Sequence, residues 1–186
     1  LLITLDDGKL ARFHDPRRFG IIDLFVKSEE KKHKLLAHLG PEPLLKTFDS
    51  DYLKAALLKR SGPIKPVLMD QKLVVGVGNI YASESLFKAG IHPLEKANKA
   101  AAKVNFLVPA IQETLKAAIA SGGSTLRDFV GAQNEGGYFQ HKFLVYERDG
   151  EPCFSCGTEI QMLVQAGRST YFCANCQRLA RDSKKY

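Results

Sequence analysis

The sequence predicts an α+β protein, with strands at both ends of the chain and helices between them. Residues 1–5 and 9–13 are strand-like segments on either side of a turn that contains Gly8, a pattern typical of a β-hairpin. Between residues 28 and 121, apolar side chains recur at helical spacing and capping residues precede them. The last third holds four cysteines at the spacing of a small metal-bound module.

The first part of the chain is predicted to be a partial β-domain over residues 1–27. Residues 21–26 are apolar and predict a third strand after the hairpin. The intervening sequence DPRRFG at residues 15–20 is expected on a loop, because Pro16 and Gly20 interrupt strand pairing. That loop presents two arginines and an aromatic side chain.

The middle of the chain, residues 28–145, is predicted to be a helical domain. A first helix is expected from Ser28 to Leu39, before Gly40 and Pro41, and a second follows a cap at Asp49 or Ser50. A long helix is expected over residues 100–121. Pro109 leaves two possibilities for that helix, because the helix either starts near the proline or kinks there.

The sequence GVGN at residues 76–79 comes directly before another predicted helix. Asn79 is expected to be its N-cap, and the free N–H groups at a helix N-terminus favour an anion such as a phosphate. Many such turns only cap a helix, which is the alternative. The motif is not a dinucleotide fingerprint, because Tyr81 replaces the third glycine.

The cysteines are arranged as Cys153-x2-Cys156 and Cys173-x2-Cys176, with sixteen residues between the pairs. Four thiolates at this spacing predict one structural Zn²⁺ with no open coordination position. The alternatives are two disulfides or four unrelated buried cysteines. The metal-bound module is expected to cover residues 146–186.

The composition favours a polyanion as partner. The 27 Lys and Arg residues outnumber the 20 Asp and Glu residues, so the formal charge is +7. A solvated basic surface is the alternative. No apolar run approaches the roughly 18–20 residues of a membrane helix and no signal peptide is recognisable, so we expect the reducing cytoplasm. Because the strand-like run begins at Leu1 rather than at a methionine, we also expect the chain to be a fragment of a longer protein.

Four motifs in order resemble the bacterial formamidopyrimidine-DNA glycosylase family, also called the Fpg/Nei family, and the resemblance covers nearly the whole chain. They are DPRRFG at residues 15–20, MDQKLVVGVGNIYASE at 69–84, GYF at 137–139, and GRST at 167–170 between the two cysteine pairs. The first and third motifs resemble the branch that acts on 8-oxoguanine and formamidopyrimidines.

The resemblance implies the remnant of a β-sandwich N-terminal domain, a helix-two-turn-helix domain and a C-terminal zinc β-hairpin finger. Its members act in base-excision repair as bifunctional DNA glycosylases and AP lyases, which flip an oxidised purine out of the duplex, cut its glycosidic bond and break the strand through a Schiff base. Their nucleophile is an N-terminal proline amine, assisted by a glutamate and a lysine. None of these matches a residue here, so we expect the 186 residues alone to be inactive.

The resemblance also implies roles for individual residues. Arg17 corresponds to the arginine that faces the orphaned cytosine, Phe19 to the wedge that unstacks the neighbouring pair, and Arg18 to a phosphate contact or a brace of the loop. Asn79 and Arg168 correspond to the pair that clamps the phosphate beside the lesion. We assign Arg168 electrostatic stabilisation at the δ-elimination step, because a guanidinium is a poor proton donor.

The remaining expected contacts fall into two groups. The further DNA-binding residues are Arg60, Lys65, Gly78 and Tyr146, and the loop over the flipped base contains Gly131, Gln133, Asn134, Gly136, Gly137 and Tyr138.

The expected partner is therefore double-stranded DNA with an oxidised purine or an abasic site, bound by a monomer in the bacterial cytoplasm and, through DNA, at the nucleoid. No membrane partner is expected. Two alternatives remain at this point: a non-catalytic binder of damaged or kinked DNA, and an RNA-binding zinc ribbon.

Overall fold

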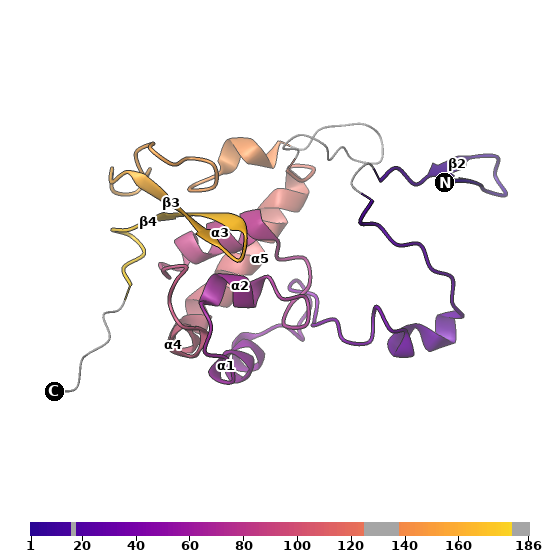
Figure 1. The fold of residues 1–186 in the computed structure, drawn as a ribbon, viewed down its shortest axis with the longest axis horizontal. Coiled ribbons are helices and arrows are strands. Elements are labelled where there is room, and N and C mark those ends of the chain that lie inside the picture. Colours follow the sequence, from indigo (N-terminus) through magenta and orange to yellow (C-terminus); the bar gives the residue numbers. More distant parts are fainter. Residues whose placement is uncertain (16–17, 125–137, 180–186) are drawn as a thin grey trace. The chain divides into compact units, whose positions relative to one another are not determined.

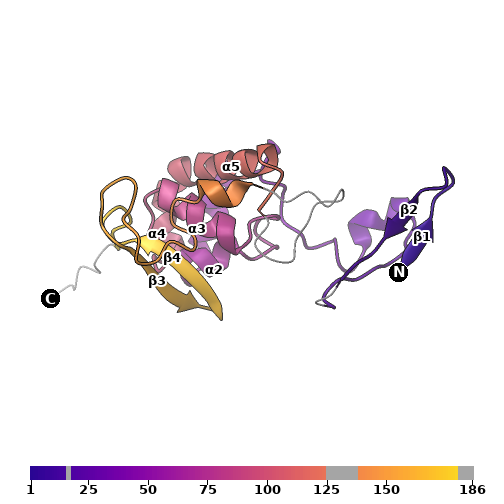
Figure 2. The ribbon, with the colours of Figure 1, turned by 90° about the horizontal axis from the view of Figure 1, so that it is seen from above.

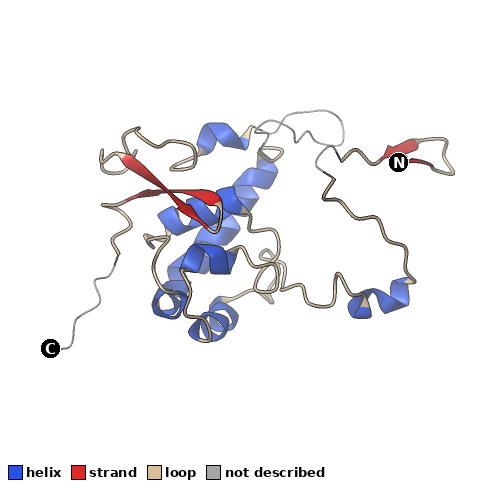
Figure 3. Ribbon diagram, viewed as in Figure 1, coloured by secondary structure: helices blue, strands red, loops and turns tan. Residues whose placement is uncertain are grey.

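The computed structural model describes residues 1–15, 18–124 and 138–179, and the chain divides into two compact units, Leu1–Ala37 and His38–Tyr186. The strands form two separate hairpins, and helices occur in both units (Figure 3), but among the described residues the α-helices lie in the second unit. The mixture of helices and strands confirms the predicted α+β class.

The first unit begins with the predicted hairpin. Strand β1 (Leu2–Thr4) pairs antiparallel with β2 (Leu10–Arg12), and Gly8 takes a positive φ of 79° in the turn, a conformation that glycine adopts without strain. The predicted third strand over residues 21–26 is wrong, because this segment forms no strand. A strand needs a hydrogen-bonded neighbour, and its apolar side chains, Leu24 among them, are exposed instead.

The helix predicted from Ser28 to Leu39 is also wrong. Only a 3-10 helix, η1 (Lys27–Lys32), forms there, and turns follow it. The apolar stripe of Leu35, Leu36 and Leu39 remains exposed. A short amphipathic helix is stable only when its apolar face packs against a partner, and no described residue of the first unit buries these side chains.

The second unit contains the helices, which surround one main core (Figure 1). Asp49 confirms the predicted cap of the first of them, because its side chain accepts a hydrogen bond from the backbone N–H of Tyr52 at 2.8 Å. The helices are α1 (Ser50–Leu58), α2 (Ile64–Leu68), α3 (Asn79–Lys88), α4 (Ala97–Ala100), η2 (Ala101–Lys103), α5 (Val104–Ala120) and η3 (Phe139–Lys142).

Helix α5 is the long helix that the sequence predicts, although it begins later, at Val104. Pro109 lies inside it rather than at its start. Pro109 lacks the N–H that would bond the carbonyl of Asn105, and both residues are exposed, so water can satisfy that carbonyl. The apolar face of α5 packs into the core, since Ile111, Leu115 and Ala118 are buried.

Three apolar clusters hold the second unit together. The largest joins α1, α2, α3 and α5, and its fully buried side chains include Leu53, Leu57, Ile64, Leu68, Leu86, Leu107 and Ile111. A second cluster contains Phe87, Val145, Cys153, Ile160 and Cys173. A third contains Ala118, Phe139, Phe143 and Tyr146. The second cluster ties the C-terminal hairpin to α3.

The C-terminal hairpin consists of β3 (Ile160–Gln165) and β4 (Arg168–Cys173), paired antiparallel from Ile160–Cys173 to Gln165–Arg168. Its two-residue turn has positive φ at both positions, 47° at Ala166 and 73° at Gly167, as a type I′ turn requires. Both views show β4 lying against α3 (Figures 1 and 2). Strand β4 therefore attaches the C-terminal hairpin to the helices of the second unit.

None of the helices in the described ranges has the length and apolar character needed to cross a membrane.

Candidate nucleic-acid interface and metal centre

The four cysteine sulfurs form one tight cluster, in which all Sγ atoms lie within 4.8 Å of one another. The Cys153–Cys176 and Cys156–Cys173 Sγ distances are 3.9 and 3.5 Å. A tetrahedral Zn²⁺ with Zn–S bonds of about 2.3 Å requires S–S edges of about 3.8 Å, whereas a disulfide is about 2.05 Å long. The geometry fits zinc and excludes the disulfide alternative. A hydrogen bond from the Thr158 side chain lowers the pKa of Cys156 to about 5, whereas burial raises the pKa values of Cys173 and Cys176, so those two thiols need a bound cation to become thiolates.

A buried glutamine links the second cysteine pair to the helical part of the unit. The Gln177 side chain accepts the backbone N–H of Cys173 at 3.0 Å and donates to the carbonyl of Ile91 at 2.8 Å. One side chain thus connects a metal ligand to the segment after α3. The metal centre shapes the hairpin and its attachment, and it leaves no position for a substrate.

Lys65, near the start of α2, lies at the centre of a buried polar network. Its Nζ donates to Asn79 Oδ1 at 2.6 Å, to the carbonyl of Ser169 at 3.0 Å and to Thr170 Oγ1 at 2.7 Å. The residue is 1% exposed. Burial, and then the nearby charge of Arg168, lower the pKa of Lys65 to about 8. The network joins two helices to the hairpin.

Asn79 is the first residue of α3, and this corrects the predicted cap. Gly78 is the N-cap, and no side chain caps the helix. The Asn79 side chain turns away to other partners, because its Nδ2 donates to the Tyr146 hydroxyl at 3.2 Å and to the carbonyl of Ser169 at 3.0 Å. The first-turn N–H groups therefore receive no side-chain cap, and the positive end of the helix dipole can attract an anion.

Tyr146 is positioned by a glutamate that sequence reasoning did not single out. Glu84 of α3 is 1% exposed, and its carboxylate accepts the backbone N–H groups of Leu144, Val145 and Tyr146 at 2.9, 3.0 and 2.9 Å. Burial raises the pKa of Glu84, and the three N–H groups act against that rise. A lone acid among the apolar residues of a predicted helix is the signal that could have identified this anchor.

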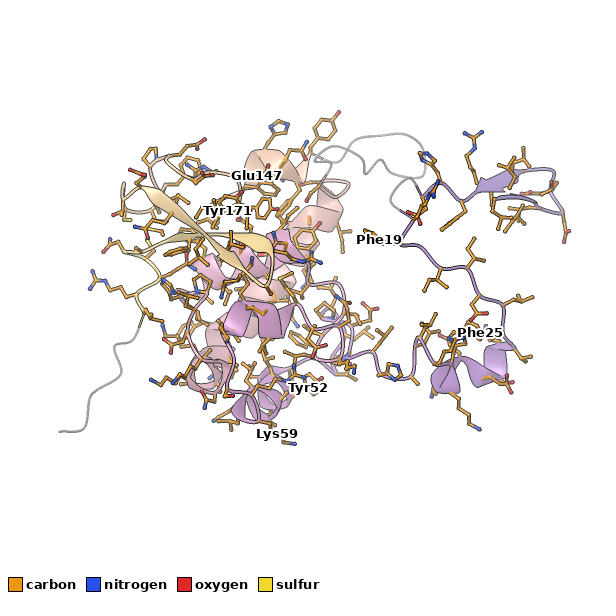
Figure 4. All side chains as sticks on the ribbon, viewed as in Figure 1. Phe19, Phe25, Tyr52, Lys59, Glu147 and Tyr171 are labelled. Atoms are coloured by element: carbon orange, nitrogen blue, oxygen red, sulfur yellow. The ribbon has the colours of Figure 1, made fainter. Side chains whose placement is uncertain are left out.

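An edge-to-face aromatic contact extends this anchoring to the hairpin. The rings of Tyr146 and Tyr171 have centroids 5.0 Å apart, and Tyr171 lies on β4 (Figure 4). Tyr146, whose hydroxyl accepts a hydrogen bond from Asn79, is therefore positioned in two ways. Glu84 binds its backbone N–H, and Tyr171 of the hairpin contacts its ring.

Arg168 is exposed at the first position of β4, directly after the tight turn. Its strand partner Gln165 is buried, and the Gln165 side chain donates to the carbonyl of Pro93 at 3.2 Å. The base of the turn is thus fixed while the guanidinium remains accessible. In the described part of the chain, neither Arg168 nor Lys65 forms an ion pair with a carboxylate. The N-terminus of α3 and the charged side chains of Lys65 and Arg168 therefore lie in one region, and no described carboxylate pairs with either side chain.

Arg60 is not part of this network. Its Nη1 donates to Asp70 Oδ2 at 2.8 Å, and both side chains are partly exposed. The guanidinium is therefore committed to a carboxylate, which reduces the net charge that it could offer to a phosphate.

The loop with the DPRRFG sequence belongs to the first unit. Asp15 accepts the backbone N–H of Gly20 at 2.6 Å, which closes the loop, and Arg18 has a positive φ of 56°. Phe19 is 77% exposed and projects from a segment without helix or strand (Figure 4). Arg17 lies outside the described residues.

Tyr138 is the only member of the predicted lesion loop within the described residues. It is 69% exposed, and its backbone N–H donates to the carbonyl of Ser121 at 2.9 Å. Its ring stacks on His141 at a centroid distance of 6.4 Å. The others, Gly131, Gln133, Asn134, Gly136 and Gly137, lie outside the described residues.

Two parts of the second unit match known protein families. Residues 39–130 match the formamidopyrimidine-DNA glycosylase H2TH domain, and residues 150–179 match the zinc finger found in FPG and IleRS. The formamidopyrimidine-DNA glycosylase of Ruegeria pomeroyi is 51% identical over 181 residues, which cover 96% of this chain and 64% of that protein. The chain thus spans less than two thirds of the length of this curated relative.

Solved structures agree with this assignment. The Fpg protein of Thermus thermophilus superimposes with a TM-score of 0.87 at 38% identity, over 97% of this chain and 68% of that one. The Lactococcus lactis Fpg, solved in a complex with DNA that contains an abasic site, gives a TM-score of 0.82 at 37% identity, over 95% and 70% of the two chains. Because both domain matches, the curated relative and the solved structures agree, the chain belongs to the formamidopyrimidine-DNA glycosylase family.

Proposed function

We propose that this chain is the DNA- and zinc-binding portion of a bifunctional DNA glycosylase and AP lyase that removes oxidised purines, such as 8-oxoguanine and formamidopyrimidines, in base-excision repair. The observation that carries the proposal is the network of Lys65, Asn79, Ser169 and Thr170. It holds the uncapped N-terminus of α3 beside the hairpin that bears Arg168. A helix N-terminus and a guanidinium together suit the phosphate of a kinked DNA backbone.

The proposed roles are those that the family resemblance implies, and for the described residues their exposure and hydrogen bonds support them. Arg168 and the backbone N–H of Asn79 bind the phosphate beside the lesion, since the Asn79 side chain is already bonded to Lys65, Tyr146 and Ser169, and Arg168 also stabilises negative charge during δ-elimination. Arg17 and Phe19 fill the gap left by the flipped base. The Tyr146 hydroxyl, which accepts a hydrogen bond from Asn79, is proposed to donate its own proton to a second phosphate oxygen. The further proposed contacts are Arg18, Arg60 and Gly78 on the DNA backbone, and Gly131, Gln133, Asn134, Gly136, Gly137 and Tyr138 around the flipped base.

The proposed partner is double-stranded DNA with an oxidised purine or an abasic site, bound by a monomer. The Lactococcus relative was crystallised with DNA of the second kind, which supports this choice. The proposed division is a β-domain over residues 1–27, a helical domain over 28–145 and a zinc module over 146–186. The two family matches fall inside the second and third of these ranges.

Binding and cleavage are expected to separate in this chain. The 186 residues contain no counterpart of the N-terminal proline nucleophile that the family resemblance implies. We therefore expect the chain to bind a damaged duplex without forming a Schiff base.

The test compares the affinity of the 186-residue chain for three duplexes of one sequence, which carry an abasic site, 8-oxoguanine opposite cytosine, or no damage. We expect preference for the damaged duplexes and a steep loss of affinity with salt. Arg168→Ala should weaken binding to the abasic duplex by about tenfold or more, as the loss of a charge-assisted hydrogen bond predicts. The matched control is Arg178→Ala, which removes another exposed arginine of the zinc module and should change the affinity less than about twofold.

Equal affinity for damaged and undamaged duplexes, or tighter binding to RNA hairpins, would contradict the proposed function. Borohydride treatment adds the catalytic readout, because a trapped covalent adduct would overturn the expected inactivity of this chain. Damage-specific binding without an adduct is the outcome that we expect.

A further inference from the structure

The ammonium group of Lys65 has no donor left for a ligand. A lysine ammonium carries three N–H donors, and here Asn79 Oδ1, the carbonyl of Ser169 and Thr170 Oγ1 accept them at 2.6, 3.0 and 2.7 Å. The side chain lies among these acceptors and not at the surface, since the residue is 1% exposed. A phosphate could reach Nζ only if it displaced one of them.

The bond to Asn79 decides which end of that amide faces which partner. Oδ1 meets the ammonium, so Nδ2 is directed at the Tyr146 hydroxyl and the carbonyl of Ser169. A flipped amide would place Nδ2 against the ammonium, donor against donor, and Oδ1 against the Ser169 carbonyl, acceptor against acceptor. Lys65 therefore makes one orientation of Asn79 strongly preferred.

The same group connects parts of the chain that are distant in sequence. Ser169 and Thr170 follow Lys65 by 104 and 105 residues, and they come directly after Arg168 on β4. The backbone N–H of Lys65 also lies 3.5 Å from the carbonyl of Pro93, which accepts the Gln165 side chain. The buried Lys65 side chain thus connects the start of α3 to β4, the strand that begins with Arg168.

We propose that Lys65 is a positioning residue, which orients the Asn79 amide and fixes the Arg168 strand beside it, and that it does not contact DNA itself. This inference deepens the proposed function and rests on it for the DNA-binding readout. It replaces the expectation that Lys65 binds the DNA backbone directly. One of its hydrogen bonds acts through the Asn79 amide, and the other two act through the strand that follows Arg168.

A double-mutant cycle tests the proposal with Lys65→Met, Asn79→Ala and the double variant of the 186-residue chain. We expect each single variant to bind the abasic duplex about tenfold or more weakly, the size expected for a lost charge-assisted hydrogen bond. The double variant should bind more tightly than the product of the two single losses predicts, because part of the effect of Lys65 passes through the amide that Asn79→Ala removes. Lys54→Met is the matched control, since Lys54 is exposed on α1 and should have little effect. Losses that multiply in the double variant would overturn the inference and indicate an independent phosphate contact.

A measurement on the free protein separates this inference from the proposed function. The Asn79 side-chain Nδ2 resonances should shift in Lys65→Met and stay unchanged in Lys54→Met, with the remaining spectrum that of a folded chain. Unmoved Asn79 resonances would overturn the inference alone, whereas failure of the wild-type chain to prefer damaged DNA would overturn the proposed function alone. If Lys65→Met does not fold, Thr170→Val serves instead, because it removes one acceptor of the ammonium in a side chain of the same shape. It should weaken binding more when Asn79 is present than in the Asn79→Ala background, and equal losses in the two backgrounds would overturn the inference.

Discussion

Replacing Glu84 with alanine tests whether one buried carboxylate holds the segment that carries Tyr146. Its oxygens accept the backbone N–H groups of Leu144, Val145 and Tyr146 at 2.9, 3.0 and 2.9 Å. Because Glu84 is 1% exposed, these donors depend on the carboxylate and not on bulk water.

The magnitude follows from the donors that alanine would leave without an acceptor. A buried N–H group without a partner costs about 1–3 kcal/mol. Water that enters the vacated space can satisfy one or two of the three donors. Glu84→Ala also removes the burial cost of the carboxylate, which is the cost that raises the pKa of Glu84. We therefore expect the free energy of unfolding to fall by about 2–4 kcal/mol.

Urea denaturation followed by far-ultraviolet circular dichroism measures this loss, since the chain has no tryptophan for fluorescence. Glu113→Ala is the matched control, because it removes an exposed glutamate from α5 and should change stability by less than about 0.5 kcal/mol. A loss below about 0.5 kcal/mol for Glu84→Ala, at an unchanged denaturant slope, would refute the anchoring argument. DNA affinity should fall with stability, because Tyr146 loses its fixed place beside Asn79.

Three further predictions concern the turn, the metal and an ion pair. Ala166→Asn should raise the melting temperature and stabilise the chain by about 0.5–1 kcal/mol, because asparagine tolerates the positive φ of 47° better than alanine does; a lower melting temperature would contradict the type I′ turn. Cys173→Ser should abolish stoichiometric zinc in elemental analysis and, with it, binding to damaged DNA; full affinity without zinc would show that the metal does not hold the hairpin. The backbone N–H of Lys72, followed by Arg60, holds the pKa of Asp70 below its usual value, so the stabilisation is present above about pH 4 and is lost as pH falls through the lowered pKa. Asp70→Asn should therefore make the free energy of unfolding, measured with urea, less dependent on acid pH. The difference should be less than about 1 kcal/mol, because the pair is partly exposed. An unchanged acid dependence would contradict this assignment.

The features that the sequence predicts correctly are those set by neighbouring residues. The Asp49 cap needs only the N–H group three residues later, and the Gly8 turn needs only a residue that accepts positive φ. The zinc ligands are recognisable because thiolate chemistry and short Cys-x2-Cys spacing leave few other arrangements.

The wrong predictions concern segments whose structure depends on a partner elsewhere. Residues 21–26 have the composition of a strand and residues 28–39 that of an amphipathic helix, but neither has a neighbour that buries its apolar side chains. Propensity is a weak term beside packing, so these segments remain without the expected elements. The Asn79 cap fails for the opposite reason, since distant residues offer its side chain better partners than its own helix does.

The sequence by itself determined the α+β class, the metal ligands, the presence of a helix after the GVGN sequence, and the family through four ordered motifs. Only the tertiary structure decided that Lys65 is buried with its donors saturated, that Glu84 anchors Tyr146, and that Arg168 lies beside the N-terminus of α3. These facts depend on contacts between residues up to 105 positions apart. Local sequence sets backbone preferences and metal chemistry. A buried charge, however, binds the acceptors that folding brings within hydrogen-bonding distance, and these can be far away in the sequence.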